Sequence, residues 1–332
     1  MSDEPDLEAR VAAAVVAWDD EDEDAFDEAL ALLPQKGDAG FALGRSLIAR
    51  ADPIERELGA VILREVINPD RDHVGAIVAT LVPLIGGESD PLVLGSAILA
   101  LGLASDRDAI IAICRHSKHD DEGVRLAVAK ALPPIYRDEI EAGSYISTLL
   151  ALSSDTDDDV REWACLDLAR LLDDDTPELR SALAARLHDP HEGTRCEAIV
   201  GLASRHDPRA LPPLLAMLEE GSSLMLLVEA AAWIGDASLV PHLLDFASDD
   251  EVEAALDRCD PKRRARREAR NAALVEALAA HGIEATVNPE AFDDEISWVS
   301  PNGNRQAVIE RVLARPDVNG DIQAAAARLA QP

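Results

Sequence analysis

A short phrase recurs along the chain about every 34 residues. An acidic or Asp-Pro turn is followed by an arginine or its equivalent, then by a small residue three positions later and a leucine seven positions later. The best copy contains Arg161, Ala164 and Leu168. The arginine position is held in the other copies by Phe26, Arg56, Leu94, Arg125, Arg195 and Leu227. A period of this length indicates a repeat array, in which the core grows along one axis.

Each copy of the phrase predicts an amphipathic helix that is preceded by a second helix. Offsets of three and seven residues fall on one helical face, so the small residue and the leucine point toward a common core. A further apolar stretch lies between successive phrases, for example from Ala210 to Leu218 and from Leu239 to Phe246. Acidic turns directly precede the helix of the phrase, where carboxylates cap free N–H groups. Each unit is therefore predicted to be a helix pair.

The phrase resembles the HEAT repeat, especially the short HEAT-like repeats of phycobilisome lyases and many bacterial proteins. The signatures of tetratricopeptide and ankyrin repeats are absent. The resemblance covers residues 26 to 257 and implies an all-α fold, a right-handed α-solenoid of the armadillo type with about seven helix pairs. In such arrays turn aspartates and arginines form a hydrogen-bonded ladder between neighbouring repeats. By resemblance, the ladder residues are Arg56, Arg125, Arg161 and Arg195, and the ladder is interrupted at Leu94 and Leu227.

The chain changes character after residue 257. It has 64 acidic and 31 basic residues and a net charge of −33, yet residues 258–332 contain equal numbers of both signs. We therefore predict an acidic repeat array over residues 1–257 and a capping segment over residues 258–332. The basic run from Lys262 to Arg270 predicts a helix that lies against the acidic repeats and helps to cap them. A surface for nucleic acid or for an acidic partner is the alternative interpretation.

The two ends of the array are also predicted to be closed by short elements. At the amino end, a helix from Leu7 to Trp18 pairs with one from Ala25 to Leu33. At the carboxyl end, the segment from Ile283 to Asn304 predicts irregular or short extended structure. Two closing helices follow, from Gln306 to Leu313 and from Asp321 to Leu329.

Composition restricts the environment and the partners. The excess of acidic side chains disfavours general nucleic-acid binding. No apolar run approaches the length of about 20 residues that spans a membrane, and the amino terminus is acidic, unlike a signal peptide. The four cysteines are scattered without a C-x-x-C pair, which indicates reduced packing residues. We expect a cytoplasmic monomer without a membrane contact.

The sequence contains no recognisable motif for catalysis, a cofactor or a metal. Nucleotide-binding glycine loops, zinc-protease motifs and the nucleophile elbow are absent. The candidate metal ligands that cluster in the sequence are Cys114, His116 and His119, and the pair His188 and His191. Their offsets from the repeat arginine differ, so we predict no metal site. Deoxyhypusine hydroxylase, a HEAT-like enzyme, holds iron with several His-Glu pairs, whereas this chain has a single one at residues 191–192.

A surface row of the repeat helices is the predicted binding site. The position two residues after the repeat arginine points away from the packing face, and by resemblance it lines the concave side. This row consists of Glu28, Leu58, Ser96, Ala127, Trp163, Glu197 and Glu229. Trp163, flanked by carboxylates, is the predicted centre, because tryptophan anchors interfaces and carboxylates select a basic partner. The predicted contact residues are Glu162, Trp163, Asp167, Glu197 and Glu229; the alternative is that Trp163 packs against a neighbouring repeat.

The functional expectation is a non-enzymatic scaffold that binds a basic protein through its acidic concave face. HEAT arrays serve mainly as binding platforms, which is what the resemblance implies. Two alternatives stay open: an immunity-type inhibitor that mimics nucleic acid and blocks a basic enzyme, and a phycobilin-lyase-like enzyme. An enzyme would be recognised by a pocket with converging polar groups and perturbed ionisation.

Overall fold

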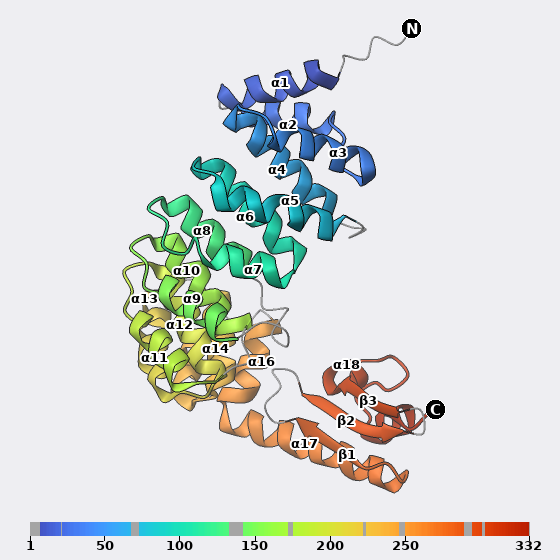
Figure 1. Cartoon of the computed structure of the whole chain (residues 1–332). Coiled ribbons are helices and arrows are strands. Elements are labelled where there is room, and N and C mark those ends of the chain that lie inside the picture. Colours follow the sequence, from blue (N-terminus) through green and yellow to red (C-terminus); the bar gives the residue numbers. More distant parts are fainter. Residues whose placement is uncertain are drawn as a thin grey trace. The chain divides into compact units, whose positions relative to one another are not determined.

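The computed structural model describes residues 7–20, 22–67, 73–132, 142–171, 175–221, 224–245, 250–288, 294–300 and 303–331 (Figure 1). The chain consists of two compact units, residues 1–201 and residues 202–332. This division lies earlier than the change of composition at residue 257. Helices make up 74% of the structure, which confirms the prediction of a helical repeat fold. Among the described helices, none combines the length and the apolar character that a membrane span requires.

The first unit is built from paired helices. Every residue at the repeat-arginine position in this unit lies in the second helix of a pair, as predicted. The helices are α1 (Leu7–Asp19), α2 (Glu23–Ala31), α3 (Gly37–Ile48), α4 (Pro53–Ile67), α5 (Val74–Gly87), α6 (Pro91–Ala104), α7 (Arg107–Cys114), α8 (Glu122–Ala131), α9 (Ala142–Leu152), α10 (Asp158–Leu166), α11 (Pro177–Arg186) and α12 (Glu192–Ser204), which crosses the division between the units. A π-helical turn, η2 (Asp167–Leu171), continues α10.

Second helices of successive pairs pack on one another, from α4 to α6, α8 and α10 (Figure 1). Leu63, Leu101, Leu132 and Leu168 hold the position seven residues after the repeat arginine, and each is 0% exposed. The small residues three positions after the arginine are buried as well. The apolar face predicted from the repeat phrase is therefore the core of this unit, with aliphatic side chains excluding water between the helices.

Aspartates in the turns cap the second helices. Asp90, Asp121 and Asp157 each accept a hydrogen bond from the backbone N–H three residues later, at 3.0 to 3.2 Å. A cap of this kind satisfies one of the N–H groups that a helix leaves free at its start. The acidic turns therefore have the structural role that the sequence predicts.

The second unit contains helices followed by a small sheet. Its elements are η3 (Pro208–Ala210), α13 (Leu211–Glu220), α14 (Leu224–Ile234), η4 (Ala237–Leu239), α15 (Val240–Leu244), α16 (Asp250–Cys259), α17 (Pro261–Ala280), β1 (Ala285–Asn288), β2 (Glu295–Ser300), β3 (Gly303–Val308), α18 (Ile309–Leu313) and α19 (Ile322–Leu329). The strands form an antiparallel sheet in the order β1-β2-β3, with Thr286 opposite Ser297 and Ser297 opposite Gln306. One face of the sheet packs with α17 and α19 around a separate core that includes Leu274, Ile296 and Trp298.

The tail differs from the prediction in one element. The predicted helix from Gln306 to Leu313 begins only at Ile309, because Gln306 to Val308 pair with β2 and belong to a strand. The extended segments predicted before it correspond to β1 and β2, and the last helix matches α19, which Asp321 caps. A polar, short strand such as β3 lacks the apolar alternation by which strands are recognised from sequence.

The basic helix α17 makes two kinds of ion pair. Arg263 pairs with Glu253 and Asp257 of α16, at 2.5 and 3.4 Å, so one arginine does contact acidic residues of the repeat segment. Arg267 and Arg270 instead pair with Asp294, which immediately precedes β2. The prediction that the whole run from Lys262 to Arg270 lies against the acidic repeats is therefore wrong for these two arginines. Their partner is a carboxylate of the tail itself, 5% exposed at its side chain.

Arg161 connects two successive repeats through a fork of hydrogen bonds. Its Nε and one terminal nitrogen donate to the two carboxylate oxygens of Asp189, at 2.9 and 2.8 Å. The other terminal nitrogen donates to the carbonyl oxygens of Asp155 and Thr156 in its own turn, at 3.0 and 3.1 Å. Arg161 is only 5% exposed. A planar guanidinium provides this bidentate geometry, which a lysine cannot reproduce.

The same contacts recur at Arg125 and Arg56. Arg125 binds both carboxylate oxygens of Asp155 at 2.8 and 2.9 Å, and Arg56 binds those of Glu88 at 2.7 and 3.1 Å. Each of them also donates to two carbonyl oxygens of its own turn. Arg195 donates to the carbonyl oxygens of residues 189 and 190, at 2.7 and 3.0 Å. We call the contacts of Arg56, Arg125 and Arg161 the arginine ladder.

Each carboxylate of the arginine ladder also accepts a backbone N–H of its own turn. Asp189 accepts from residue 191, Asp155 from residue 157, and Glu88 from residue 90. Burial opposes the charged form of Asp189 and Asp155, but the arginine and the amide outweigh it and hold the pKa of both below the usual range. For Glu88 the hydrogen bond from Arg56 is the main reason that its pKa is lowered. All three carboxylates are therefore charged at neutral pH.

Removal of a ladder arginine should be costly in proportion to its burial. We expect Arg161→Ala to lower the free energy of unfolding by about 3 kcal/mol, because the buried carboxylate of Asp189 loses its bidentate partner and keeps only the contact with Arg186 at 3.2 Å. Arg195→Ala, which among the described residues removes hydrogen bonds to carbonyl oxygens, should cost about 1 kcal/mol. Urea denaturation of the two variants measures both values. Equal losses would contradict the assignment of Asp189 as the dominant partner.

Candidate functional site

A groove lies between α4, α6 and α8 on the face formed by the second helices. It has a volume of about 420 Å³. We call it the α4–α8 groove, and its lining includes Glu57, Asp90, Leu92, Gly95, Ser96, Leu99, Asp121, Leu126, Ala127 and Lys130. Glu57, Gly95 and Leu126 stand one residue after the repeat-arginine position, and Ser96 and Ala127 two residues after it. The surface row predicted from the sequence therefore contributes to the groove, together with a neighbouring row that the prediction did not include.

The floor of the groove is apolar and open. Leu92 is 58% exposed, and Leu99 and Leu126 are partly exposed. Gly95 leaves space between them, since a Cβ atom built there would meet nothing closer than the Cβ of Ala127 at 3.9 Å. An exposed leucine beside an unfilled hollow is apolar surface that a ligand can cover. Covering it removes apolar area from water, which favours binding.

Glu57 is the most perturbed ionisable group of the groove. It is 8% exposed, and burial raises its pKa to about 7, with the charge of Asp90 adding to the effect. The Ser96 hydroxyl donates a hydrogen bond to the Glu57 carboxylate at 3.2 Å, which favours the charged form and limits the increase. A carboxylate with this pKa exchanges its proton near neutral pH, so a nearby cation can switch it to the charged form.

Trp163 stands at the next second helix, beyond the end of the groove. It is 39% exposed, and the Nζ atom of Lys130 lies 5.0 Å from the centre of its ring. Lys130 also lines the groove, so the cation–π contact connects Trp163 to that surface. Trp163 is exposed to solvent, as expected of a binding residue. Its contact with Lys130 of the preceding repeat also agrees with the alternative that it packs against a neighbouring repeat.

Two other predicted contact residues are not at the surface. Asp167 is 4% exposed and begins the π-helical turn, which changes the direction of the side chains that follow α10. One of its carboxylate oxygens has no hydrogen-bond partner, and burial raises its pKa to about 8. Glu197 is also 4% exposed and pairs with Arg170 at 2.7 Å. The expectation that these two carboxylates attract a partner is therefore wrong.

The remaining predicted contact residues are partly exposed. Glu162 faces His191 of the following repeat, with 3.6 Å between a carboxylate oxygen and Nδ1. Glu229 is partly buried in α14 of the second unit. Glu57 was missed because a glutamate directly after the repeat arginine has the ordinary pattern of a solvated helix face. Its only sequence signal is that the same offset holds Gly95 and Leu126 in the next repeats.

Potential metal ligands converge at one place in the described part of the chain. Asp159, Glu162 and His191 offer ligand atoms that all lie within 4.8 Å of one another. The sequence candidates Cys114, His116 and His119 form no such group within that part. His119 uses Nδ1 to accept the backbone N–H of Asp121 at 3.1 Å, a contact that shapes the turn before α8.

The burial of Glu57 should appear in the pH dependence of stability. Its pKa rises from 4.5 to about 7 on folding, so the folded state holds this proton more tightly than the unfolded state does. The protein therefore loses stability as the pH increases through this range. We expect Glu57→Gln to gain stability relative to the original protein by up to about 3 kcal/mol between pH 5 and pH 8. Urea denaturation at both pH values measures the difference, with Glu65→Gln on the same helix as the control. A pH-independent difference would contradict the raised pKa.

Comparisons with known proteins agree with the repeat architecture. A family model of HEAT repeats matches residues 146–226. Protein YibA of Escherichia coli K12 is 32% identical over 117 residues, which cover 34% of this chain and 41% of YibA, and YibA of Escherichia coli O157:H7 gives the same values. The match thus spans less than half the length of these curated relatives.

The X-ray structure of YibA shares the fold. It superposes with a TM-score of 0.61 and 20% identity, covering 79% of this chain and 99% of the YibA chain. The repeated helix pairs, the arginine positions and these similarities agree, and the chain is a HEAT-like repeat protein.

Proposed function

We propose that this chain is a protein-interaction array whose α4–α8 groove binds a segment of a partner protein. The segment carries apolar side chains and a lysine or arginine. The observation that supports the proposal most directly is the combination, in one groove, of an open leucine floor with the carboxylates of Glu57, Asp90 and Asp121.

The size and lining of the groove match a short peptide segment. A volume of about 420 Å³ holds a few side chains, and hollows of this size with mostly apolar lining and few polar groups are typical binding sites. A partner helix with apolar residues on one face would cover Leu92, Leu99 and Leu126. Trp163, beside Lys130, extends the contact surface along the array and supplies an aromatic anchor.

The charge of the chain favours a basic partner. The whole net charge of −33 belongs to residues 1–257, and a field of this sign accelerates association with a cationic protein. Asp90 and Asp121 already accept backbone N–H groups as helix caps, so Glu57 is the groove carboxylate with most capacity for a new partner. A lysine or arginine that reaches Glu57 would favour its charged form and release its proton.

A catalytic role is the second candidate, and one observation favours it. The Ser96 hydroxyl and the Glu57 carboxylate form a hydrogen-bonded pair inside the groove, with the pKa of Glu57 raised to about 7 by burial. A hydroxyl beside a base is the arrangement of an activated nucleophile. Ser96→Ala distinguishes the candidates, since it removes the nucleophile but leaves the leucine floor and the Glu57 carboxylate in place.

Filling the groove should weaken binding without unfolding the array. A displayed library of random peptides, selected on the full chain, should yield sequences with leucine-like residues and a lysine or arginine. Gly95→Leu places a side chain in the open space and should weaken a selected peptide at least about tenfold, since it removes the apolar surface that the peptide covers. Fluorescence polarisation measures the affinity.

Gly86→Leu is the matched control, because a Cβ atom at Gly86 would meet nothing within 4 Å and this residue lies outside the groove lining. Equal affinity of the Gly95→Leu variant and the original protein would contradict the proposal. An inhibitor that mimics nucleic acid through its charge alone would also be unaffected by this change.

Binding of the selected peptide should strengthen as Glu57 ionises. Between pH 6 and pH 8 the charged fraction of a group with pKa about 7 rises about tenfold, so we expect a similar increase in affinity. Glu57→Gln should remove this dependence and leave the affinity near that of the neutral form. A peptide whose affinity changes equally in both proteins would show that Glu57 does not contact its cation.

A further inference from the structure

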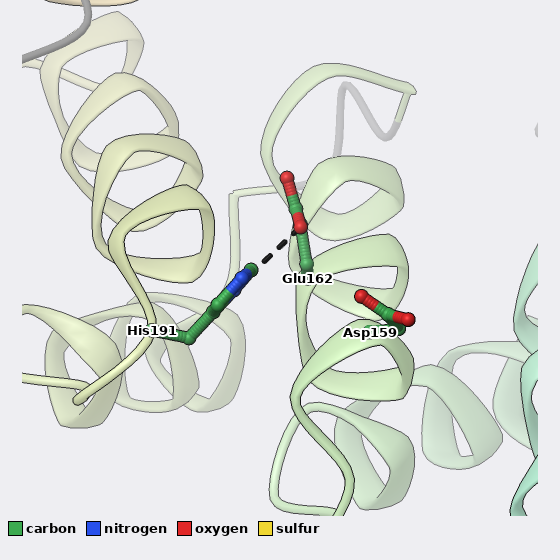
Figure 2. A group of neighbouring side chains, drawn as sticks. All are labelled: Asp159, Glu162 and His191. Atoms are coloured by element: carbon green, nitrogen blue, oxygen red, sulfur yellow. Dashed lines mark ion pairs between the residues drawn. The ribbon is translucent and has the colours of Figure 1, made fainter.

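Three side chains from two successive repeats meet between α10 and the start of α12. Asp159 and Glu162 project from α10, and His191 belongs to the turn that precedes α12. Figure 2 shows the His191 ring directed toward Glu162, with Asp159 on the same helix as Glu162. All three offer ligand atoms within 4.8 Å of one another, and the group lies outside the α4–α8 groove lining.

We propose that Asp159, Glu162 and His191 bind a divalent transition-metal ion that joins the two repeats. The ion would take one oxygen from each carboxylate and Nδ1 or Nε2 from the imidazole. Water would fill its remaining positions, because none of the three side chains is fully buried.

Apart from the contact between Glu162 and His191, the two carboxylates have no cationic partner within the described residues. Asp158, the residue before Asp159, pairs with Arg161, but neither Asp159 nor Glu162 forms an ion pair with a described lysine or arginine. Separated by three positions on a helix, they are neighbours and repel each other. In a chain of net charge −33, a bound cation would relieve this repulsion.

His191 stands where most other copies of the repeat phrase carry an aspartate, and the copy at Leu227 has Ser223. The residue four positions before the repeat arginine is an aspartate at positions 52, 121 and 157, and at the Leu94 copy it is Asp90. Only the turn that faces Asp159 and Glu162 has histidine there. Histidine is not a preferred helix cap, so its presence at this turn calls for another role, and metal ligation is a common role of the imidazole.

The surroundings hold these ligands in place. The His191 backbone N–H donates to Asp189 at 3.0 Å, and Asp189 is fixed by the ladder contact with Arg161. The imidazole Nδ1 also lies 3.2 Å from the Thr194 hydroxyl. The Glu162 carboxylate lies against Gly193, where a Cβ atom would come within 2.3 Å of its oxygen. Gly193 therefore leaves the room that this carboxylate occupies.

The donor set determines the class of ion. Imidazole favours zinc, nickel and cobalt, whereas magnesium and calcium prefer oxygen ligands alone. Three protein ligands with nitrogen and oxygen donors is the number that open zinc sites use, and water completes their coordination. Metal–ligand distances of about 2.0 to 2.2 Å require the three side chains to move slightly closer together, which partly exposed side chains can do.

The test uses the full chain after treatment with a chelator, and the metal ions alone as probes. Isothermal titration with Zn²⁺ should show one ion per chain, with weaker binding of Mg²⁺. Glu162→Gln keeps the size of the side chain beside Gly193 and should weaken Zn²⁺ binding at least about tenfold, the lower range found even for residues that only support a ligand. Asp159→Asn should act in the same direction.

His191→Asn completes the set, and because this residue directly precedes α12, thermal unfolding without metal verifies that the variant is folded. Glu178→Gln and His188→Asn are the controls, since both side chains are exposed and lie outside the group. Unchanged affinity in the controls together with weaker binding in Glu162→Gln supports the site. Absence of Zn²⁺ binding to the original protein, or equal binding by Glu162→Gln, would overturn it.

Discussion

The buried contact between an arginine fork and the carboxylate of the next turn is the constraint on which the first unit depends. A guanidinium that is taken out of water needs all its donors satisfied, and Arg161 meets that need with two carboxylate oxygens of Asp189, one of Asp158 and two carbonyl oxygens. The contact fixes the distance between successive turns and the direction in which each second helix starts. Much of the acidic composition is thereby structural, since the same carboxylates also accept backbone N–H groups.

The parts predicted from sequence are those that the repeat period determines. The period identifies the second helices, their buried leucines and the turns that cap them, because each of these depends on spacing within one repeat. Asp167 and Glu197 were misplaced for reasons that spacing does not contain. A π-helical turn alters the side-chain directions after α10, and Arg170 reaches Glu197 across 27 residues. The strand β3 was missed because its residues are polar, although it pairs with the adjacent strand β2.

One repeat position provides different chemistry in successive repeats. The residue directly after the arginine position is Glu57 in α4, Gly95 in α6, Leu126 in α8 and Glu162 in α10. Because the core is formed by the residues three and seven positions after the arginine position, the side chain directly after it can vary without loss of the core. The first three form the charged end, the open space and the apolar wall of the groove. The fourth faces His191 and belongs to the proposed metal site.

The helix α17 takes part in two different packing environments. Asp260 caps its first turn, and Arg263 of that turn pairs with α16. Its last turns place Leu274 and Leu278 in the core of the small sheet. A helix of 20 residues is about 30 Å long, so the three-stranded sheet is connected to the repeat helices through one continuous helix. Loss of α17 would therefore disturb both the contact with α16 and the core around the sheet, so the two kinds of structure in the second unit share one element.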